Sequence, residues 1–198
     1  AEGVDVLILG EMGIGNTTAA SAIVAALTGE RVETLVGRGT GIDDVALERK
    51  IAAIRRGLEL HRPDPDDPID VLAKVGGLEI AALTGAMLAA ASARVPVILD
   101  GFITGAAALA AVAFDPAVRD YMIAAHRSVE PGHILILERL DLYPLLDLRL
   151  RLGEASGAAL AAPLLDAAIA LLNDMATFAE AGVSERIDAP ESEGSRSA

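Results

Sequence analysis

Short apolar runs alternate along this chain with longer segments whose apolar residues recur every three or four positions. The continuous runs predict buried strands at residues 4–9, 32–36, 95–101, 121–125 and 145–152. The segments with helical spacing predict helices at residues 17–27, 43–58, 78–91, 104–113 and 158–178. Residues 133–140 fit a strand or a helix, and we expect a helix. This alternation predicts an α/β fold of Rossmann-like type, with a mostly parallel sheet covered by helices on both faces.

Proline and polar residues mark the expected limits of the folded parts. Residues 62–68 contain three prolines and three aspartates, which predicts a loop between two blocks of the chain. Pro163 limits where the last helix begins, or kinks it. The polar residues 184–198 predict a disordered tail. We therefore expect one large α/β domain over residues 1–183, followed by that tail.

The charge balance narrows the classes of partner. The chain has 16 Lys and Arg residues against 29 Asp and Glu residues, a net charge of −13. Nucleic acid or an anionic membrane surface would be repelled by such a protein, so small metabolites or other proteins are the better candidates. Aromatic residues make up 3% of a chain that is 53% hydrophobic, so we expect an aliphatic, alanine-rich core with closely packed backbones.

The composition also bears on the compartment. With no cysteine, the chain has no disulfide, thiolate zinc site or cysteine nucleophile, which fits a reducing cytosol. The first residues lack the basic and apolar regions of a signal peptide. The low-charge stretches 80–92 and 103–114 are shorter than the roughly 20 residues that a membrane span requires. We expect a cytoplasmic protein without a membrane partner.

Ligands of parallel α/β sheets bind outside the carboxyl ends of the strands, so the loops after the predicted strands are the candidate site. These loops are residues 10–18, 37–43, 100–102, 126–128 and 153–157.

The first loop, GEMGIGNTT at 10–18, follows a strand and opens a helix, the context in which backbone N–H groups hold a phosphate. It is not a P-loop, because Asn16 stands where the phosphate-binding lysine belongs. It also does not match the dinucleotide-binding pattern G-x-G-x-x-G, because Gly13 and Gly15 are followed by Asn16, Thr17 and Thr18. A tight turn capped by Asn16 or a threonine is the alternative. Glu11 is electrostatically unfavourable beside a phosphate unless it has another role.

The second glycine-rich loop, GRGTG at 37–41, adds the cation of Arg38, and Thr40 or Asp43 is its capping candidate. By spacing alone an anion site and a flexible turn are about equally supported. Lys50, two turns into the next helix and off its apolar stripe, is either solvated or directed at this site.

Two carboxylates at strand ends are candidates for chemistry. Asp100 and Glu154 could contact ribose hydroxyls or transfer protons, although many such residues merely cap the next helix. His61, His126 and His133 have no metal-like spacing, so we expect no zinc site. Taken alone, these residues indicate a phosphate-bearing small ligand and one or two working carboxylates, but they name no reaction.

Five segments carry a family resemblance: GEMGIGNTT at 10–18, GRGTG at 37–41, VGGLEI at 75–80, LDGF at 99–102 and RLGEASGA at 151–158. In this order they resemble the motifs of the nicotinate-nucleotide:dimethylbenzimidazole phosphoribosyltransferase family. Two departures stand out. Ala155 occupies a position where the family often has glycine. The family's chains are also longer, so we expect this chain to correspond to their C-terminal large part, without an N-terminal segment that helps to form the benzimidazole pocket.

The resemblance implies transfer of the 5-phosphoribosyl group from nicotinate mononucleotide to 5,6-dimethylbenzimidazole in cobalamin lower-ligand synthesis. It implies Glu154 as the base and Glu11 near the reacting centre. It also implies a homodimer, small-molecule substrates, no cofactor and no metal. The implied substrate-binding residues are Met12, Gly13, Gly15, Asn16, Thr17, Arg38, Gly39, Thr40, Lys50, Asp100, Gly101, Ser128 and Leu152.

Two alternatives remain open. One is a catalytically incomplete module that binds the nucleotide phosphate, or a subunit fragment of the same enzyme. The other is an ATP- or GTP-using P-loop enzyme, which Asn16 weakens.

Overall fold

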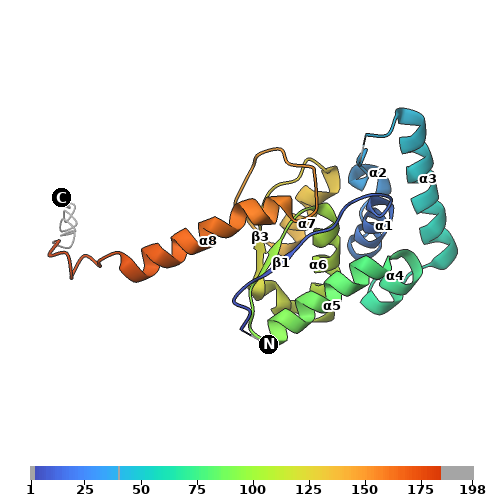
Figure 1. The fold of residues 1–198 in the computed structure, drawn as a ribbon. Coiled ribbons are helices and arrows are strands. Elements are labelled where there is room, and N and C mark those ends of the chain that lie inside the picture. The colour runs from blue at the N-terminus through green and yellow to red at the C-terminus, as the bar shows by residue number, and fades with distance from the viewer. Residues whose placement is uncertain (1–2, 40, 184–198) are drawn as a thin grey trace, which may run out of the picture. The chain divides into compact units, whose positions relative to one another are not determined.

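The computed structural model describes residues 3–39 and 41–183. In chain order the elements are β1 (Leu7–Leu9), α1 (Thr17–Thr28), α2 (Val32–Leu35), α3 (Asp44–His61), α4 (Pro68–Val75), α5 (Leu78–Ser92), β2 (Val97–Leu99), α6 (Phe102–Phe114), the 3₁₀ helix η1 (Pro116–Tyr121), β3 (Met122–Ala124), α7 (Pro131–Leu140) and α8 (Ser156–Asp174) (Figure 1). The chain divides into two compact units, Ala1–Pro163 and Leu164–Ala198. The expectation of one domain over residues 1–183 stays a prediction, and the expected tail lies outside the described residues.

A parallel sheet of three strands in the order β1-β2-β3 forms the centre of the first unit. Leu7 is paired with Val97, and Val97 with Met122. Successive strand side chains point to opposite faces, and all three residues of β2 are buried, so both faces of the central strand are covered. The α/β prediction is confirmed.

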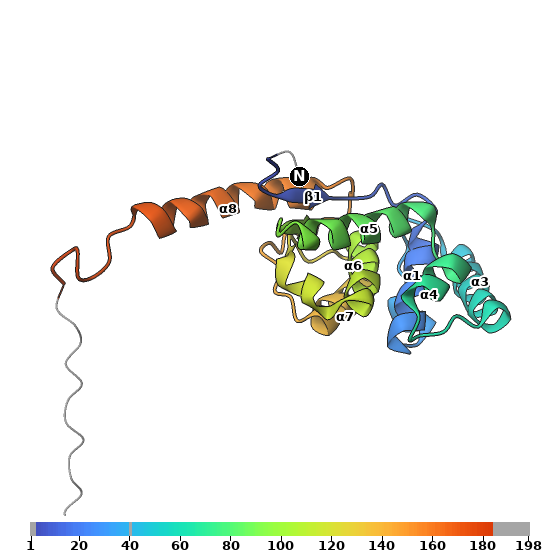
Figure 2. The same ribbon diagram turned by 90° about the horizontal axis from the view of Figure 1, so that it is seen from below.

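Alanine-rich helices pack closely around this sheet. Helix α6 contacts α1, α5 and α7, and both α5 and α6 contact β2. Figure 2 shows α5 and α6 on the same side of β1. Almost the whole length of α6 is buried, including five alanines with no exposed surface: Ala106, Ala107, Ala108, Ala110 and Ala111. The expected aliphatic core of small side chains is therefore confirmed.

The helix ends follow local sequence signals. Asp43 caps α3 by accepting a hydrogen bond from Ala46 N at 2.8 Å, and Asp67 caps α4, whose first residue is Pro68. Between these helices lies the expected proline-rich loop, but it covers residues 62–67, because Pro68 already belongs to α4. The helices predicted at 17–27, 78–91, 104–113 and 133–140 are confirmed as α1, α5, α6 and α7, and the last two begin two residues earlier than predicted. Neither α4 nor η1 was predicted.

Two predicted strands are wrong. Residues 32–36 form the short helix α2, in which Val32 and Leu35 are both buried. Burying residues three apart on one side requires a helical turn, and this packing outweighs the strand preference of valine. Residues 145–152 form one isolated bridge, between Leu146 and His126, and are otherwise irregular, with Arg149 at a φ of +55°. Leu145 N and Leu146 N donate to carbonyls at the end of β3, at 3.0 Å each, so the pairing begins where that strand stops.

The last helix, α8, starts two residues earlier than expected and contains Pro163. Within the described residues it is the helix whose length and composition would suffice to cross a membrane: it has 19 residues, a mean hydropathy of 1.5 and 17% of its tested window buried. The helix itself was predicted, but only the stretches 80–92 and 103–114 were considered as membrane spans, so the length and apolar composition of α8 were missed.

Candidate functional site

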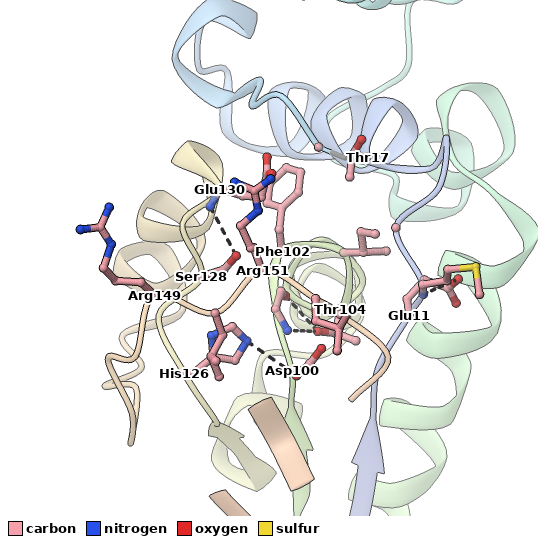
Figure 3. A pocket seen from close by; sticks show the side chains of 18 residues that line it. Glu11, Thr17, Asp100, Phe102, Thr104, His126, Ser128, Glu130, Arg149 and Arg151 are labelled. Atoms are coloured by element: carbon pink, nitrogen blue, oxygen red, sulfur yellow. Dashed lines mark hydrogen bonds and ion pairs between the residues drawn. The ribbon is translucent and has the colours of Figure 1, made fainter. Parts of the chain in front are cut away.

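A cavity of about 570 Å³ lies at the carboxyl ends of all three strands, within the first unit (Figure 3). Glu11 follows β1, Asp100 follows β2 and His126 follows β3. Figure 3 shows Glu11 on one side of the cavity and His126, Ser128 and Arg149 on the other. The complete lining is Glu11, Met12, Gly13, Thr17, Gly39, Asp100, Gly101, Phe102, Ile103, Thr104, His126, Ser128, Glu130, Arg149, Leu150, Arg151, Leu152 and Gly153.

The structure brings most of the sequence-predicted site residues together at this cavity. Those that line it are Glu11, Met12, Gly13, Thr17, Gly39, Asp100, Gly101, Ser128 and Leu152. Asn16 and Lys50 do not line it but contact residues that do. Gly15, Arg38 and Glu154 are not part of the lining, and Thr40 lies outside the described residues.

The loop after β1 holds the carboxylate of Glu11 in place. Its Oε1 accepts hydrogen bonds from the Met12 backbone N–H at 3.0 Å and from Asn16 Nδ2 at 3.3 Å. Gly13 and Gly15 have φ of +86° and +83°, a left-handed region that favours glycine. Asn16 precedes α1 without a side-chain capping bond, so the capping alternative for this residue is wrong. The amide group of Asn16 orients the carboxylate instead.

Lys50 reaches the cavity wall from α3. Its Nζ donates to Thr17 Oγ1 at 2.8 Å and to the Gly37 carbonyl at 3.3 Å. Burial lowers the pKa of Lys50, an effect that the charge of Glu130 partly opposes. Lys50 is therefore half-buried and directed at the threonine that opens α1. The interpretation as a solvated lysine is wrong.

The arginines at the cavity differ from the one that the sequence suggested. Arg38 donates to the Ile42 carbonyl at 2.9 Å and pairs with Asp44 on the exposed surface. Arg149 and Arg151, which the sequence analysis did not single out, line the cavity instead. Their signal was present as two cations flanking Leu150, but the segment was interpreted as a buried strand.

Asp100 is buried beneath the cavity and binds backbone rather than a cation. Its Oδ1 accepts from Gly157 N at 2.8 Å and Ala158 N at 3.1 Å. His126 Nε2 lies 3.6 Å from the same oxygen, as the dashed line in Figure 3 shows. The alternative that Asp100 caps the next helix is wrong, because the helix whose N–H groups it accepts is α8 and not α6, which follows it in sequence.

A second buried histidine supports the opposite wall. His133 Nδ1 accepts a hydrogen bond from Ser128 N at 3.0 Å. Burial, reinforced by nearby His126, lowers the pKa of His133 to about 3. His133 is therefore neutral, so its Nδ1 can accept the hydrogen bond from the Ser128 N–H, which fixes the backbone there. The described part of the chain holds no group of three or more His, Cys, Asp or Glu side chains placed to bind a metal ion.

Glu154 is exposed and lies in a tight turn beside the cavity. Gly153, Glu154 and Ala155 have φ of +81°, +55° and +59°, so two residues with side chains adopt a conformation that favours glycine. Glu154 N donates to the Glu11 carbonyl at 2.9 Å. This bond ties the turn that carries one candidate carboxylate to the loop that carries the other.

The VGGLEI segment at 75–80 lies elsewhere. It joins α4 to α5 and contributes to a second cavity of about 570 Å³. Ile69 and Leu78 in its lining are 62% and 90% exposed. This segment therefore does not contribute to the cavity at the strand ends.

Comparison with known proteins agrees with these features. A family model described as Phosphoribosyltransferase matches residues 1–183. The nicotinate-nucleotide–dimethylbenzimidazole phosphoribosyltransferases of Chloroflexus aggregans and Roseiflexus sp. are 64% and 61% identical to this chain, over 94% of its length and 53% of their own. The crystal structure of CobT from Thermus thermophilus matches with a TM-score of 0.88 and 51% identity, over 93% of this chain and 55% of that one.

These matches cover nearly all of this chain. The chain, however, spans about half the length of the curated relatives it matches. Because the family model matches 1–183 of 198 residues, the chain belongs to the phosphoribosyltransferase family.

Proposed function

We propose that the protein containing this chain transfers the 5-phosphoribosyl group from nicotinate mononucleotide to 5,6-dimethylbenzimidazole, giving α-ribazole 5′-phosphate and nicotinate. The observation that carries the proposal is the meeting of four of the five resembling segments at one cavity, or at its border, in a chain 64% identical to a relative named for this reaction. The product would serve cobalamin lower-ligand synthesis.

The chemistry of the two rings determines which catalytic groups are needed. In nicotinate mononucleotide the ring nitrogen is a pyridinium, so the C1′–N bond breaks with its electron pair returning to a neutral ring and no acid is required. One benzimidazole nitrogen forms the new bond to C1′, and the other must lose its proton. A single base on the acceptor side is sufficient.

Glu154 is our proposed base, and Glu11 the carboxylate that stabilises positive charge developing at C1′. The hydrogen bond from Glu154 N to the Glu11 carbonyl supports this pairing, because it keeps the two loops adjacent. Glu11 is further oriented by Asn16. The carboxylate thus has a role that explains its place beside a phosphate site.

The donor phosphate is proposed to bind at the start of α1, where unpaired N–H groups of the helix attract anions. Lys50 Nζ and Thr17 Oγ1, already 2.8 Å apart, would both contact it. Gly13, Gly15 and Gly39 allow the backbone to come close. Because the chain carries a net charge of −13, binding of this anion depends on such local donors and not on long-range attraction.

The flat bases are proposed to lie between Met12 and Leu152. Both side chains line the cavity, and both residues are more than half exposed. Asp100, Gly101 and Ser128 line the side toward β2 and β3. Arg38, which is paired with Asp44 at the surface, is proposed to contact the nucleotide only if that pair opens.

The test is direct. The native protein that carries this chain is incubated with nicotinate mononucleotide and dimethylbenzimidazole, and α-ribazole phosphate is measured. Glu154→Gln should lower kcat about 10²-fold or more, whereas Glu59→Gln, on the exposed side of α3, should leave it unchanged. No product from the native protein, or equal rates in native and Glu154→Gln proteins, would contradict the proposal.

A second candidate function is a catalytically incomplete module. It is favoured because this chain spans only about half the length of the relatives it matches. Calorimetry separates the two, because a module binds the mononucleotide without turnover.

We also propose a cytoplasmic homodimer without nucleic-acid or membrane partners. Light scattering of the native protein and fractionation of cells would test these two points.

A further inference from the structure

The backbone that follows Glu154 is anchored to the centre of the sheet by one buried carboxylate. Asp100 is 2% exposed, and its Oδ1 accepts the N–H groups of Gly157 and Ala158. These are the second and third residues of α8, which begins two residues after Glu154. N–H groups in the first turn of a helix have no partner inside the helix, so the carboxylate fixes where α8 starts.

His126 closes the same junction. Its ring is buried, with the residue 3% exposed and Nε2 3.6 Å from Asp100 Oδ1. A Cβ on residue 157 would lie 2.0 Å from His126 Cδ2 and 2.9 Å from Asp100 Oδ1. The imidazole therefore occupies the space that a side chain on Gly157 would need, and α8 can approach Asp100 closely because this residue is glycine.

The turn itself is held at both ends. On one side Glu154 N donates to the Glu11 carbonyl at 2.9 Å. On the other side Ser156 N donates to the Gly153 carbonyl at 3.0 Å, directly before the two N–H groups that Asp100 accepts. Left-handed residues with side chains store strain, which persists where the surroundings fix the conformation.

We propose that Asp100 and His126 are positioning residues for Glu154: they hold the start of α8, and through it the turn 153–155, at the edge of the cavity. The inference rests on the proposed function for its catalytic consequence. This positioning role differs from the role that the family resemblance implies for Asp100, which is direct contact with the substrate. A displacement of a catalytic group by about 1 Å is sufficient to lower a rate on the order of 10²-fold.

Asp100→Ala in the native protein tests the proposal with three measurements. We expect kcat to fall about 10²-fold, while the dissociation constant of nicotinate mononucleotide from calorimetry changes by less than about threefold. Hydrogen exchange of the amides in 153–158 should become at least about tenfold faster. A rise in the dissociation constant with kcat unchanged would mean substrate contact and would overturn the proposal, as would unchanged exchange.

Asp67→Ala is a matched control. Asp67 Oδ1 also accepts two N–H groups at a helix start, from Ile69 at 2.9 Å and Asp70 at 3.2 Å, but on α4 and outside the cavity lining. We expect this variant to retain kcat. If it loses as much activity as Asp100→Ala, loss of a helix cap anywhere is damaging and the positioning role is refuted.

A pair of variants keeps the test valid if Asp100→Ala fails to fold. Gly157→Ala should lower kcat strongly when His126 is present, and at least about tenfold less strongly in a His126→Ala background, where the clashing ring is gone. If Gly157→Ala lowers kcat by the same factor in the native and the His126→Ala backgrounds, the proposal is contradicted. A native protein without transferase activity would refute the proposed function instead, and the exchange measurement would still decide whether Asp100 holds the turn.

Discussion

Gly10→Ala is the sharpest test of how the two candidate carboxylates are held together. A Cβ on Gly10 would lie 2.0 Å from Ala155 N and 2.4 Å from Ala155 Cα. Ordinary contact begins at 3.4 Å, so the turn that carries Glu154 would have to move by about 1.4 Å. The obstacle is backbone that is bonded to its neighbours, so no side-chain rotation relieves it.

The expected cost of such overpacking is about 1–3 kcal/mol of unfolding free energy, or a lower Tm by roughly 2–4 °C for each kcal/mol in a chain of this size. A shift of this size at the proposed base should also lower the transfer rate about 10²-fold. Both quantities are measured on the native protein, by calorimetric unfolding and by formation of α-ribazole phosphate. Binding of the mononucleotide, followed by calorimetry, should persist.

Gly57→Ala is the control, because a Cβ there meets nothing within 4 Å. It lies inside α3, where replacing glycine by alanine should stabilise the protein by about 0.5–1 kcal/mol. If Gly10→Ala keeps the Tm and the rate of the native protein, the contact between residue 10 and the turn does not exist, and our account of the site is wrong.

Three further predictions concern residues that contact the lining of the cavity. Lys50→Met should raise the dissociation constant of nicotinate mononucleotide about 10- to 100-fold in calorimetry, and an equal effect on the phosphate-free riboside would contradict a phosphate contact. Because burial lowers the pKa of His133 to about 3, its stabilisation is complete above about pH 6.5 and is lost as the pH falls toward 3, by at most about 1.4 kcal/mol per pH unit. Urea unfolding of His133→Asn between pH 6.5 and 5 should show a shallower decline than the native protein, and equal slopes would refute this. Gly132→Ala should cost about 1–3 kcal/mol, because its Cβ would lie 2.7 Å from Phe102 Cε2 and 2.9 Å from the Leu35 carbonyl; an unchanged Tm would contradict that.

The general location of the site was predictable from the sequence. Glycine-rich loops after apolar runs, together with the rule that ligands bind at the carboxyl ends of parallel strands, led to Glu11, Asp100 and Ser128. These signals are local, because a strand end, a glycine turn and the start of a helix follow one another in the chain.

The remaining parts of the site depend on long-range packing. Lys50 contacts Thr17, 33 residues away, because α3 packs on α1. Asp100 accepts hydrogen bonds from Gly157 N and Ala158 N, which are 57 and 58 positions further along the chain. Arg149 and Arg151 both line the cavity because their segment is irregular beyond residue 146, and no period of two describes it. Such contacts are set by the assembled fold and leave no pattern in a short window of sequence.

Helix α6 has a consequence for how this protein should be probed by mutagenesis. Alanine scanning, the usual way to find residues that matter, cannot test three of its fully enclosed positions, Ala106, Ala107 and Ala108, because they are alanine already. Informative substitutions there must increase the side chain. Ala107→Val adds two methyl groups where no surface is exposed, at a cost of about 1–3 kcal/mol. Because α6 begins directly after Asp100 and Gly101, a screen that only removes atoms would miss these alanine positions in the helix on which the floor of the cavity rests.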